Sequence, residues 1–186
     1  MQINDWIQII AVLGLVSVLT PILGSFMAHV FSGEKTFLSP ILKPVENSFY
    51  KFLGTNEKEE MNWKEYLKAV LIFNGLGIVF LFLVQMLQGY LPLNPQKLEG
   101  TSWHLAFNTA ISFVTNTNWQ SYSGENTMSY FTQMVALAVQ NFLSAATGFA
   151  VLLALIRGLS RKQTEKLGNF WVDMTRSTLY VLLPLS

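Results

Sequence analysis

The chain has no cysteine, few charged residues and almost no net charge. The absence of Cys from its 186 residues excludes disulfide bonds, thiolate catalysis and cysteine-ligated metal sites. Charged residues make up only 12%, about half the usual share, which is too few to cover the surface of a soluble domain. The 12 basic and 11 acidic residues balance, so no strong field attracts nucleic acid. With 51% apolar residues, the composition is that of a membrane protein.

The sequence also lacks the usual signatures of an enzyme. His29 and His104 have no carboxylate or His neighbour at ligand spacing, which argues against a metal site. Residues 33–36 lack the glycine spacing of a phosphate-binding loop. No Ser/His/Asp arrangement suggests nucleophilic catalysis. We therefore identify no catalytic residue and no ATP site, and we expect any energy source to come from a partner.

The apolar residues are gathered in long runs that carry no Lys, Arg, Asp or Glu. These runs are Trp6–Val30, Ala69–Tyr90 and Met128–Ile156. As helices they measure about 30–45 Å, enough to cross a hydrocarbon layer of about 30 Å. Helices buried in a large soluble protein are the alternative, and three charge-free runs of this length argue against it. The sequence therefore predicts an all-α, multi-pass protein of the lipid bilayer.

A fourth apolar run, residues 170–186, stops in the middle of its pattern. We expect it to be the truncated start of a further transmembrane helix in a fragment of a longer chain. Asp173 and Arg176 are three residues apart in this run, so we expect them to pair on one helix face. An acidic cluster earlier in the chain is expected to be a solvated face. Its members are Glu57, Glu59, Glu60 and Glu65.

Lys and Arg are distributed unevenly among the connections between the apolar runs. Lysines recur through residues 31–68, whereas residues 1–5 have no basic residue and residues 91–127 have only Lys97. A second basic connection carries Arg157, Arg161, Lys162 and Lys166. Because basic connections stay in the cytoplasm, we expect the N-terminus to be outside and residues 91–127 to lie on the outer side.

The connection at residues 91–127 contains a helix that is too short to cross a membrane. Prolines and Asn in residues 91–95 mark an irregular turn, and Thr101 or Ser102 is a suitable N-cap. Apolar side chains then recur at helical spacing through residues 103–113. That helix is ~16 Å long, about half of the hydrocarbon thickness. The sequence therefore predicts a re-entrant helix between two full spans.

An uncharged polar stretch, VTNTNWQSYSGE, follows this short helix at residues 114–125. Non-helical backbone within a bilayer is tolerated only where it is buried in protein or lines water. Its carbonyl oxygens can replace the water shell of a cation, as in potassium filters, and the C-terminal end of the preceding helix adds partial negative charge. The candidate cation-binding residues of this stretch are Val114, Thr115, Asn116, Thr117, Asn118 and Gln120.

Four side chains of this stretch have expected roles of their own. Asn116 and Asn118 tolerate left-handed backbone, which can turn successive carbonyl groups toward one axis. Gln120 can offer a neutral amide oxygen at the mouth. We expect Trp119 to pack the segment from behind. The alternative is a hydrated outer loop, which the burial expected of Trp103, Phe107, Phe113 and Trp119 disfavours.

The third apolar run carries a polar face that supports a pore. Its members fall at offsets expected for one side of a helix, and polar groups of membrane helices face protein or water. They are Gln133, Gln140, Ser144 and Thr147. Asn74 and Gln85 share a face of the preceding run. Interhelical hydrogen bonds without any transport role remain an equally good interpretation of each residue singly.

Several sequence segments resemble the potassium-binding A subunits of the bacterial Kdp potassium-transporting ATPase family. The quoted segments lie in the family's order and cover the chain from about residue 33 to its end. They are GEKTFLSPILKPVE (33–46), MNWKEY (61–66), YLPLNPQ (90–96), SFVTNTNWQSYSGE (112–125) and VQNFLSAATG (139–148). The first 32 residues match mainly as an initial span.

The resemblance implies a potassium-channel-like fold of four helix–pore loop–helix repeats after an additional N-terminal helix. In this chain, residues 1–31 are the expected N-terminal span and 32–68 the cytoplasmic segment. Residues 69–156 are the first repeat, with pore helix 103–113 and filter strand 114–118. A basic cytoplasmic loop, 157–169, leads to the truncated span at 170–186. By the same resemblance, Gln120 is a filter-mouth glutamine.

The resemblance also implies the function of the whole assembly. The A subunit binds extracellular potassium in a bacterial inner membrane, and a P-type ATPase B subunit hydrolyses ATP, together with small C and F subunits. The A subunit is not an enzyme by itself, and one repeat of four cannot select ions alone. A Trk- or Ktr-type potassium transporter and a non-transporting membrane scaffold are the alternatives.

Overall fold

The computed structural model is an all-helical arrangement that describes residues 3–161 and 165–186, so Lys162 lies outside it. No strand occurs in these ranges, which confirms the expected fold class. The long helices are α1 (Ile3–Phe31), α3 (Trp63–Leu87) and α6 (Val139–Ser160), the last preceded by the π-helical segment η2 (Thr132–Ala138). The shorter ones are α2 (Ser39–Leu53), η1 (Gln88–Tyr90), α4 (Trp103–Val114) and α5 (Gly124–Thr127). The chain ends with α7 (Phe170–Arg176), η3 (Ser177–Leu182) and α8 (Leu183–Leu185).

Three helices of the described chain are long and apolar enough to cross a membrane. They cover Asn4–Phe31, Trp63–Tyr90 and Thr132–Ser160. The second begins six residues before the charge-free run at Ala69, because Asn62 caps it. The Asn62 side chain accepts hydrogen bonds from the backbone N–H groups of Lys64 and Glu65, and the Glu65 carboxylate accepts one from Asn62 N–H.

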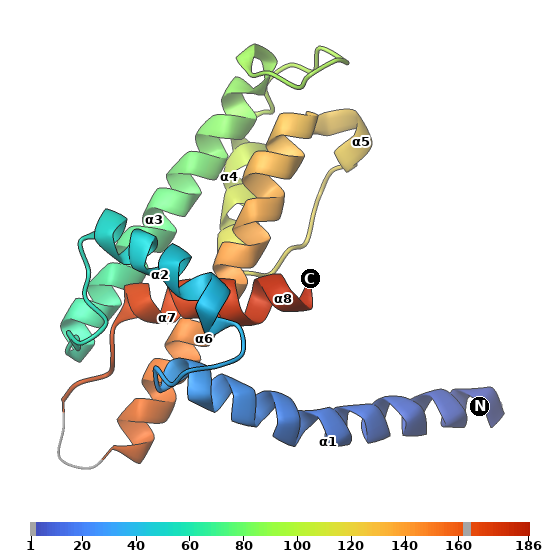
Figure 1. Ribbon diagram of the computed structural model, residues 1–186. Coiled ribbons are helices and arrows are strands. Elements are labelled where there is room, and N and C mark those ends of the chain that lie inside the picture. The colour runs from blue at the N-terminus through green and yellow to red at the C-terminus, as the bar shows by residue number, and fades with distance from the viewer. Residues whose placement is uncertain (1–2, 162–164) are drawn as a thin grey trace.

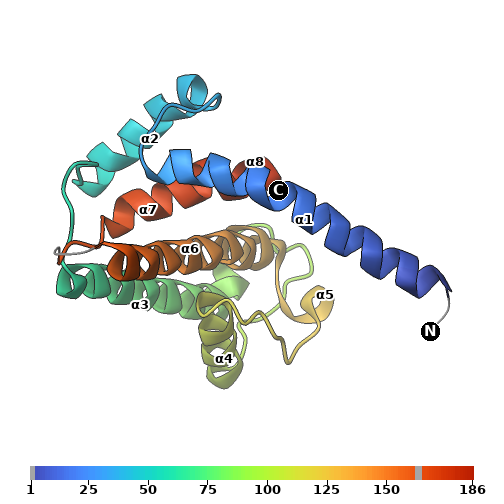
Figure 2. The ribbon, with the colours of Figure 1, turned by 90° about the horizontal axis from the view of Figure 1, so that it is seen from below.

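The helices α3, α4 and α6 form the packed centre of the molecule. Figure 1 shows α3 and the η2–α6 helix side by side, with α4 against both of them. Leu81, Ala110, Phe113, Val114 and Ala136 are buried where these helices meet. By contrast, α1 packs only near its C-terminal end and extends away from the other helices for the rest of its length (Figures 1 and 2).

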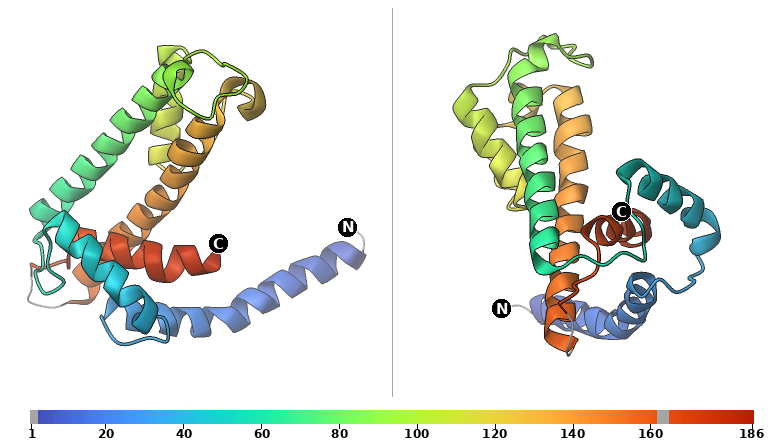
Figure 3. Two further views of the ribbon diagram at one scale, coloured as in Figure 1. Left: turned by 45° about the horizontal axis from the view of Figure 1, so that its top comes forward. Right: turned by 90° about the vertical axis from the view of Figure 1, so that its left-hand side faces the viewer.

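Helix α2 was not anticipated within the segment 32–68, and it packs on the outer side of α7. Figure 2 shows α7 between α2 and the pair α3 and α6, and the two views of Figure 3 agree. Pro40 stands in the first turn of α2, where the missing N–H costs no hydrogen bond. Gly54 ends the helix in the left-handed conformation, at a φ of 62°.

The expected pairing of Asp173 with Arg176 is wrong. Arg157 at the end of α6 donates two hydrogen bonds to Asp173, at 2.6 and 2.9 Å. Arg176 instead donates to Glu46 of α2, at 3.1 Å, and to Glu57, also at 3.1 Å. Each charge thus has its partner on another part of the chain, and not at the i,i+3 position of the same helix.

The acidic residues expected to form a solvated face at residues 57–65 are all exposed, and two of them also make ion pairs. Glu57 lies 2.7 Å from the Lys43 ammonium and 3.1 Å from the Arg176 guanidinium. Glu60 pairs with Arg161 at 2.7 Å. These carboxylates are partly exposed, but they join the segment before α3 to α2, α6 and α7. Glu57 and Glu60 therefore connect these elements while they remain exposed to solvent.

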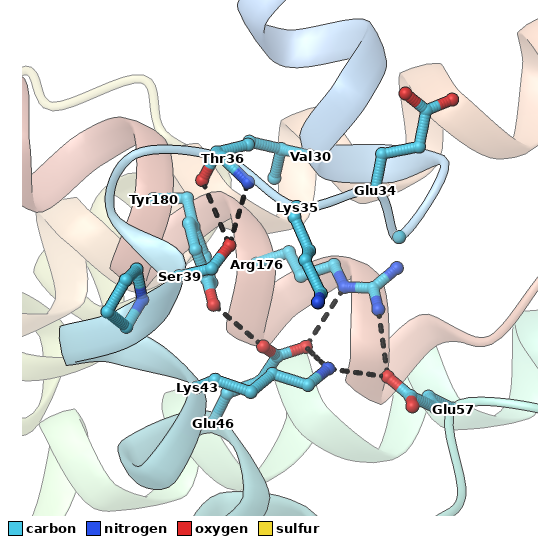
Figure 4. A pocket seen from close by; sticks show the side chains of 12 residues that line it. Val30, Glu34, Lys35, Thr36, Ser39, Lys43, Glu46, Glu57, Arg176 and Tyr180 are labelled. Atoms are coloured by element: carbon cyan, nitrogen blue, oxygen red, sulfur yellow. Dashed lines mark hydrogen bonds and ion pairs between the residues drawn. The ribbon is translucent and has the colours of Figure 1, made fainter.

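Glu46 is the buried centre of the ion cluster shown in Figure 4. Tyr50 and Tyr180 donate hydrogen bonds to its carboxylate at 2.5 and 2.8 Å, in addition to those from Arg176 and Lys43. Burial alone would raise the pKa of the Glu46 carboxyl. The hydrogen bonds from Tyr50, Tyr180 and Arg176 outweigh burial and hold that pKa below its ordinary value of 4.5.

We predict that Glu46→Gln destabilises the full-length protein in a pH-dependent way. Because folding lowers the pKa of Glu46, its charge stabilises the folded state fully above about pH 4.5 and ever less as pH falls through the folded-state pKa. The variant should lose about 2 kcal/mol at neutral pH. Thermal unfolding is measured from pH 7 to pH 4. The difference in the free energy of unfolding between the variant and the parent protein should become smaller below about pH 4.5. A constant difference would contradict the charged state of Glu46.

Candidate functional site

The short helix α4 forms as expected and stands against α3 and α6. Ser102 caps it by accepting a hydrogen bond from Leu105 N–H, at 3.4 Å. Ala106 and Ala110 are fully buried, which allows close approach to the neighbouring helices. Figure 1 shows that α4 extends only part of the way along α6, after which residues 115–123 run back toward α5. The chain therefore returns, after α4, to the side of the molecule on which this helix began.

Gln88, which the sequence did not single out, holds together the segments near the N-terminal end of α4. Its side-chain N–H₂ donates to the carbonyl oxygens of Glu99, at 2.7 Å, and Thr127, at 2.8 Å. Its side-chain oxygen accepts from Ser129 N–H and from the Thr132 hydroxyl, at 3.1 and 3.0 Å. One fully buried amide thus joins the segments before α4 and before η2 to the end of α3. A lone Gln at the end of an apolar run was the only available signal.

The backbone after α4 turns its N–H groups back onto the helix. Thr115 N–H donates to Ile111 O at 3.0 Å, and Asn116 N–H donates to Phe113 O at 3.3 Å. The carbonyl oxygen of Ser112 accepts from both Thr117 N–H, at 2.9 Å, and Asn118 N–H, at 3.2 Å. Four successive donors are therefore satisfied by the last turn of α4, and we call residues 115–118 the carbonyl turn.

The carbonyl oxygens of this turn are available to a ligand. Within residues 3–161 and 165–186, no backbone or side-chain donor is hydrogen-bonded to the carbonyl oxygens of residues 115–118. Asn116 and Asn118 adopt left-handed φ values of 57° and 58°, as expected from the tolerance of Asn for this region. Alternation of left-handed Asn with Thr lets all four N–H groups point to one side.

The side chains of the carbonyl turn hold one another and contact α6. The hydroxyls of Thr115 and Thr117 lie 2.7 Å apart. The Asn116 side-chain oxygen accepts from the Asn118 amide, at 3.0 Å, and from the hydroxyl of Ser144 on α6, at 3.2 Å. The turn is thus tied to α6 through Ser144, one of the polar residues that the spacing in this helix had singled out.

The structure places Val114, Trp119 and Gln120 at the two ends of the carbonyl turn. Val114 is the last residue of α4, and its side chain is buried in the core, so the segment 114–118 is a helix end followed by a turn rather than a strand. Trp119 was expected to pack behind the turn, and the described residues leave its side chain about half exposed. What holds Trp119 is its carbonyl oxygen, which accepts from the Ser112 hydroxyl at 2.9 Å. Gln120 is exposed, and its amide donates to the Tyr122 hydroxyl at 3.3 Å.

The polar face expected on α6 faces the interior of the molecule. Gln140, Ser144 and Thr147 are buried, and Gln140 lies against Gly77 of α3, where a Cβ would come within 3.2 Å of its side-chain oxygen. Gln133 on η2 donates to the carbonyl oxygens of Gly124 and Met128 instead. The face therefore serves interhelical packing and, through Ser144, the carbonyl turn.

These features define a class of protein: a multi-pass helical membrane protein in which a half-length helix precedes an uncharged turn with free carbonyl groups. The chain belongs to the family described as the potassium-transporting ATPase A subunit, KdpA, whose family model matches residues 10–186.

Similar proteins carry the name "Potassium-transporting ATPase potassium-binding subunit". The relative from Geobacter metallireducens is 60% identical over 98% of this chain and 31% of its own length. The relative from Pseudomonas fluorescens is 57% identical over 100% of the chain and 33% of its own length. That from Koribacter versatilis is 54% identical over 99% of the chain and 31% of its own length. The chain thus spans about a third of the length of these relatives.

Proposed function

We propose that α3, α4, the carbonyl turn and η2–α6 form one helix–pore loop–helix repeat of a potassium-selective pore. The observation that carries the proposal is the carbonyl turn. Its N–H groups are bonded to the end of α4, while its carbonyl oxygens have no partner in the described residues. The filter residues are Val114, Thr115, Asn116, Thr117 and Asn118, with Gln120 at the mouth.

The chemistry of this turn suits a weakly hydrated monovalent cation. Carbonyl oxygens can replace the water shell of potassium without adding formal charge, and such filters are built from rings of them. The C-terminal end of α4 points its partial negative charge at the same place. One repeat supplies only one segment of such a ring, so three further repeats in the complete protein would close the site.

The function of the complete protein is then uptake of extracellular potassium by an ATP-driven complex. We propose a P-type ATPase B subunit as the partner that hydrolyses ATP, with C and F subunits completing the complex. The chain would lie in a bacterial inner membrane with its N-terminus and the carbonyl turn on the outer side. The names of the relatives support the potassium-binding role, and the lysines of residues 31–68 support the orientation.

The variant Gln120→Arg tests the placement of the filter mouth. A unit charge about 10 Å from a bound cation costs ~1.7 kcal/mol at an effective dielectric constant of about 20, or about tenfold or more in affinity. In the complete complex we expect the potassium concentration for half-maximal uptake to rise by that factor while the complex still assembles. Uptake by whole cells and potassium-stimulated ATP hydrolysis by the purified complex are the two measurements.

The control for Gln120→Arg is Asn126→Arg, which adds the same charge to an exposed position on α5. It should leave potassium affinity nearly unchanged. Equal effects of the two variants, or no effect of Gln120→Arg, would contradict the placement of Gln120 at the mouth. Potassium-stimulated ATP hydrolysis by the parent complex also separates this function from that of a passive transporter, which has no pump subunit.

A further inference from the structure

Helix α2 presents an apolar stripe that the rest of the described chain covers only in part; the Phe37 ring, for example, lies 5.5 Å from the ring of Phe26 on α1. The stripe follows the helical repeat along one side of α2 and its preceding turn. Its members are Phe37, Ile41, Val45, Phe49 and Phe52. Ile41 and Phe52 are 73% and 86% exposed, values that would be costly for an apolar side chain in water.

The stripe cannot turn inward, because the opposite side of α2 is fixed by the ion cluster. Glu46 and Tyr50 are buried there, and Glu46 is bonded to Arg176 and Tyr180 on the helix that begins with α7. Figure 4 shows the side chains of Arg176 and Tyr180 reaching Glu46 of α2 from the helix that carries them. Rotation of α2 by half a turn would bury the stripe only by exposing a carboxylate that accepts four hydrogen bonds.

The position of α2 in the chain places it at the edge of a bilayer. It connects the C-terminal end of α1 to the N-terminal end of α3, both of which are long and apolar enough to span. At the start of α3, Trp63 is exposed, with the Lys64 ammonium 5.5 Å from its ring centroid. An exposed Trp beside a Lys at a helix end is typical of the membrane–water interface.

Exposed charged residues of both signs lie near the stripe, and the acidic ones are Glu34, Glu57, Glu59 and Glu60. Lys35, Lys51 and Lys58 are exposed in and around α2. A helix with aromatic and aliphatic side chains on one face and lysines beside it is typical of segments that lie in the interface plane. Exposed lysines also attract the anionic headgroups of the cytoplasmic leaflet. A protein partner would have to bury or neutralise these lysines.

We propose that α2 lies in the plane of the membrane interface, with its apolar stripe in the headgroup and acyl-chain boundary of the bilayer that the same chain crosses. The Glu46 cluster then acts as the attachment of this interfacial helix to the transmembrane helices. The proposal concerns the phospholipid surface and does not depend on potassium binding by the carbonyl turn, so either can fail without the other.

Depth measurements on the complete complex in vesicles test this proposal. In a background without other cysteines, an environment-sensitive fluorophore is attached to Ile41→Cys, Phe49→Cys or Asn47→Cys. The vesicles contain phosphatidylglycerol, phosphatidylethanolamine and a phospholipid with a quencher high on its acyl chain. The apolar face of an interfacial helix lies about 5–10 Å deep. We therefore expect the lipid quencher to reduce the fluorescence at positions 41 and 49 by at least ~2-fold. Asn47 is exposed and lies on the polar side of α2, away from the stripe, so a fluorophore there should lose little fluorescence.

Equal quenching at positions 41 and 49 indicates a helix parallel to the membrane, because eight residues correspond to ~12 Å along a helix axis. Strongly unequal depths would overturn the in-plane arrangement. Quenching by aqueous iodide instead of lipid would place the stripe in water, and protection from both quenchers would place it under protein. Either outcome overturns the proposal. Potassium-dependent ATP hydrolysis by each labelled complex verifies that it is folded.

Discussion

Replacing Asp173 by Asn is expected to destabilise the full-length protein by about 3–5 kcal/mol, because it breaks a buried ion pair and leaves one charge unpaired. The Asp173 side chain is 2% exposed, and both of its oxygens accept hydrogen bonds from Arg157. The Tyr66 hydroxyl lies 3.0 Å from the same carboxylate and 2.7 Å from the carbonyl oxygen of Ala150. The pair therefore joins α3, α6 and α7 at one point. Thermal or denaturant unfolding of the purified complex measures the loss.

The matched control for Asp173→Asn is Glu60→Gln, which breaks the exposed pair between Glu60 and Arg161. Those side chains are 40% and 38% exposed, so solvent screens the interaction and the expected cost is below about 1 kcal/mol. The double variant Arg157→Met/Asp173→Leu removes both charges and should recover most of the stability. Similar losses for Asp173→Asn and Glu60→Gln would contradict the role of the buried pair.

Replacing Asn116 by Val is expected to raise the potassium concentration for half-maximal uptake by about tenfold or more. A β-branched residue at a φ of 57° costs roughly 1–2 kcal/mol, and Val also removes the oxygen that accepts from Asn118 and Ser144. Relief of the strain would move the carbonyl groups of residues 115–118 from their positions in the turn. Uptake kinetics and potassium-stimulated ATP hydrolysis of the complete complex report the change.

Two companion variants separate backbone strain from the lost hydrogen bonds. Asn116→Gly keeps the left-handed φ without strain but removes the side chain. Ser144→Ala removes only the bond from α6. We expect the potassium concentration for half-maximal uptake of Asn116→Gly to lie between those of the parent and Asn116→Val. Ser144→Ala should change this concentration least. Unchanged potassium affinity in an assembled Asn116→Val complex would show that the carbonyl turn does not bind the ion.

The parts of the fold that follow from local chain properties were predictable from the sequence. Charge-free runs gave α1, α3 and α6, although the ends shifted where polar caps such as Asn62 extend a helix. The length of the run after Ser102 gave α4 as a half-length helix. The preference of Asn for left-handed backbone correctly located the two residues, Asn116 and Asn118, that turn the chain after it.

The parts that depend on distant contacts were not predictable in this way. Asp173 and Arg176 have suitable i,i+3 spacing, but Arg157 and Glu46 reach them from elements whose positions the sequence pattern does not give. Gln88 has four partners that are spread over three segments. Helix α2 was treated as part of a connection, because its prolines and lysines conceal a helix whose buried side is polar rather than apolar.

The most direct test of the central claim is the position of a bound ion in the complete complex. A crystal or map prepared with thallium or rubidium in place of potassium would locate the ion by its scattering. We expect a peak on a central axis, coordinated by carbonyl oxygens of residues 114–118 together with those of three similar segments. An ion peak elsewhere, with Thr115–Asn118 facing bulk solvent, would contradict the claim that this turn selects potassium.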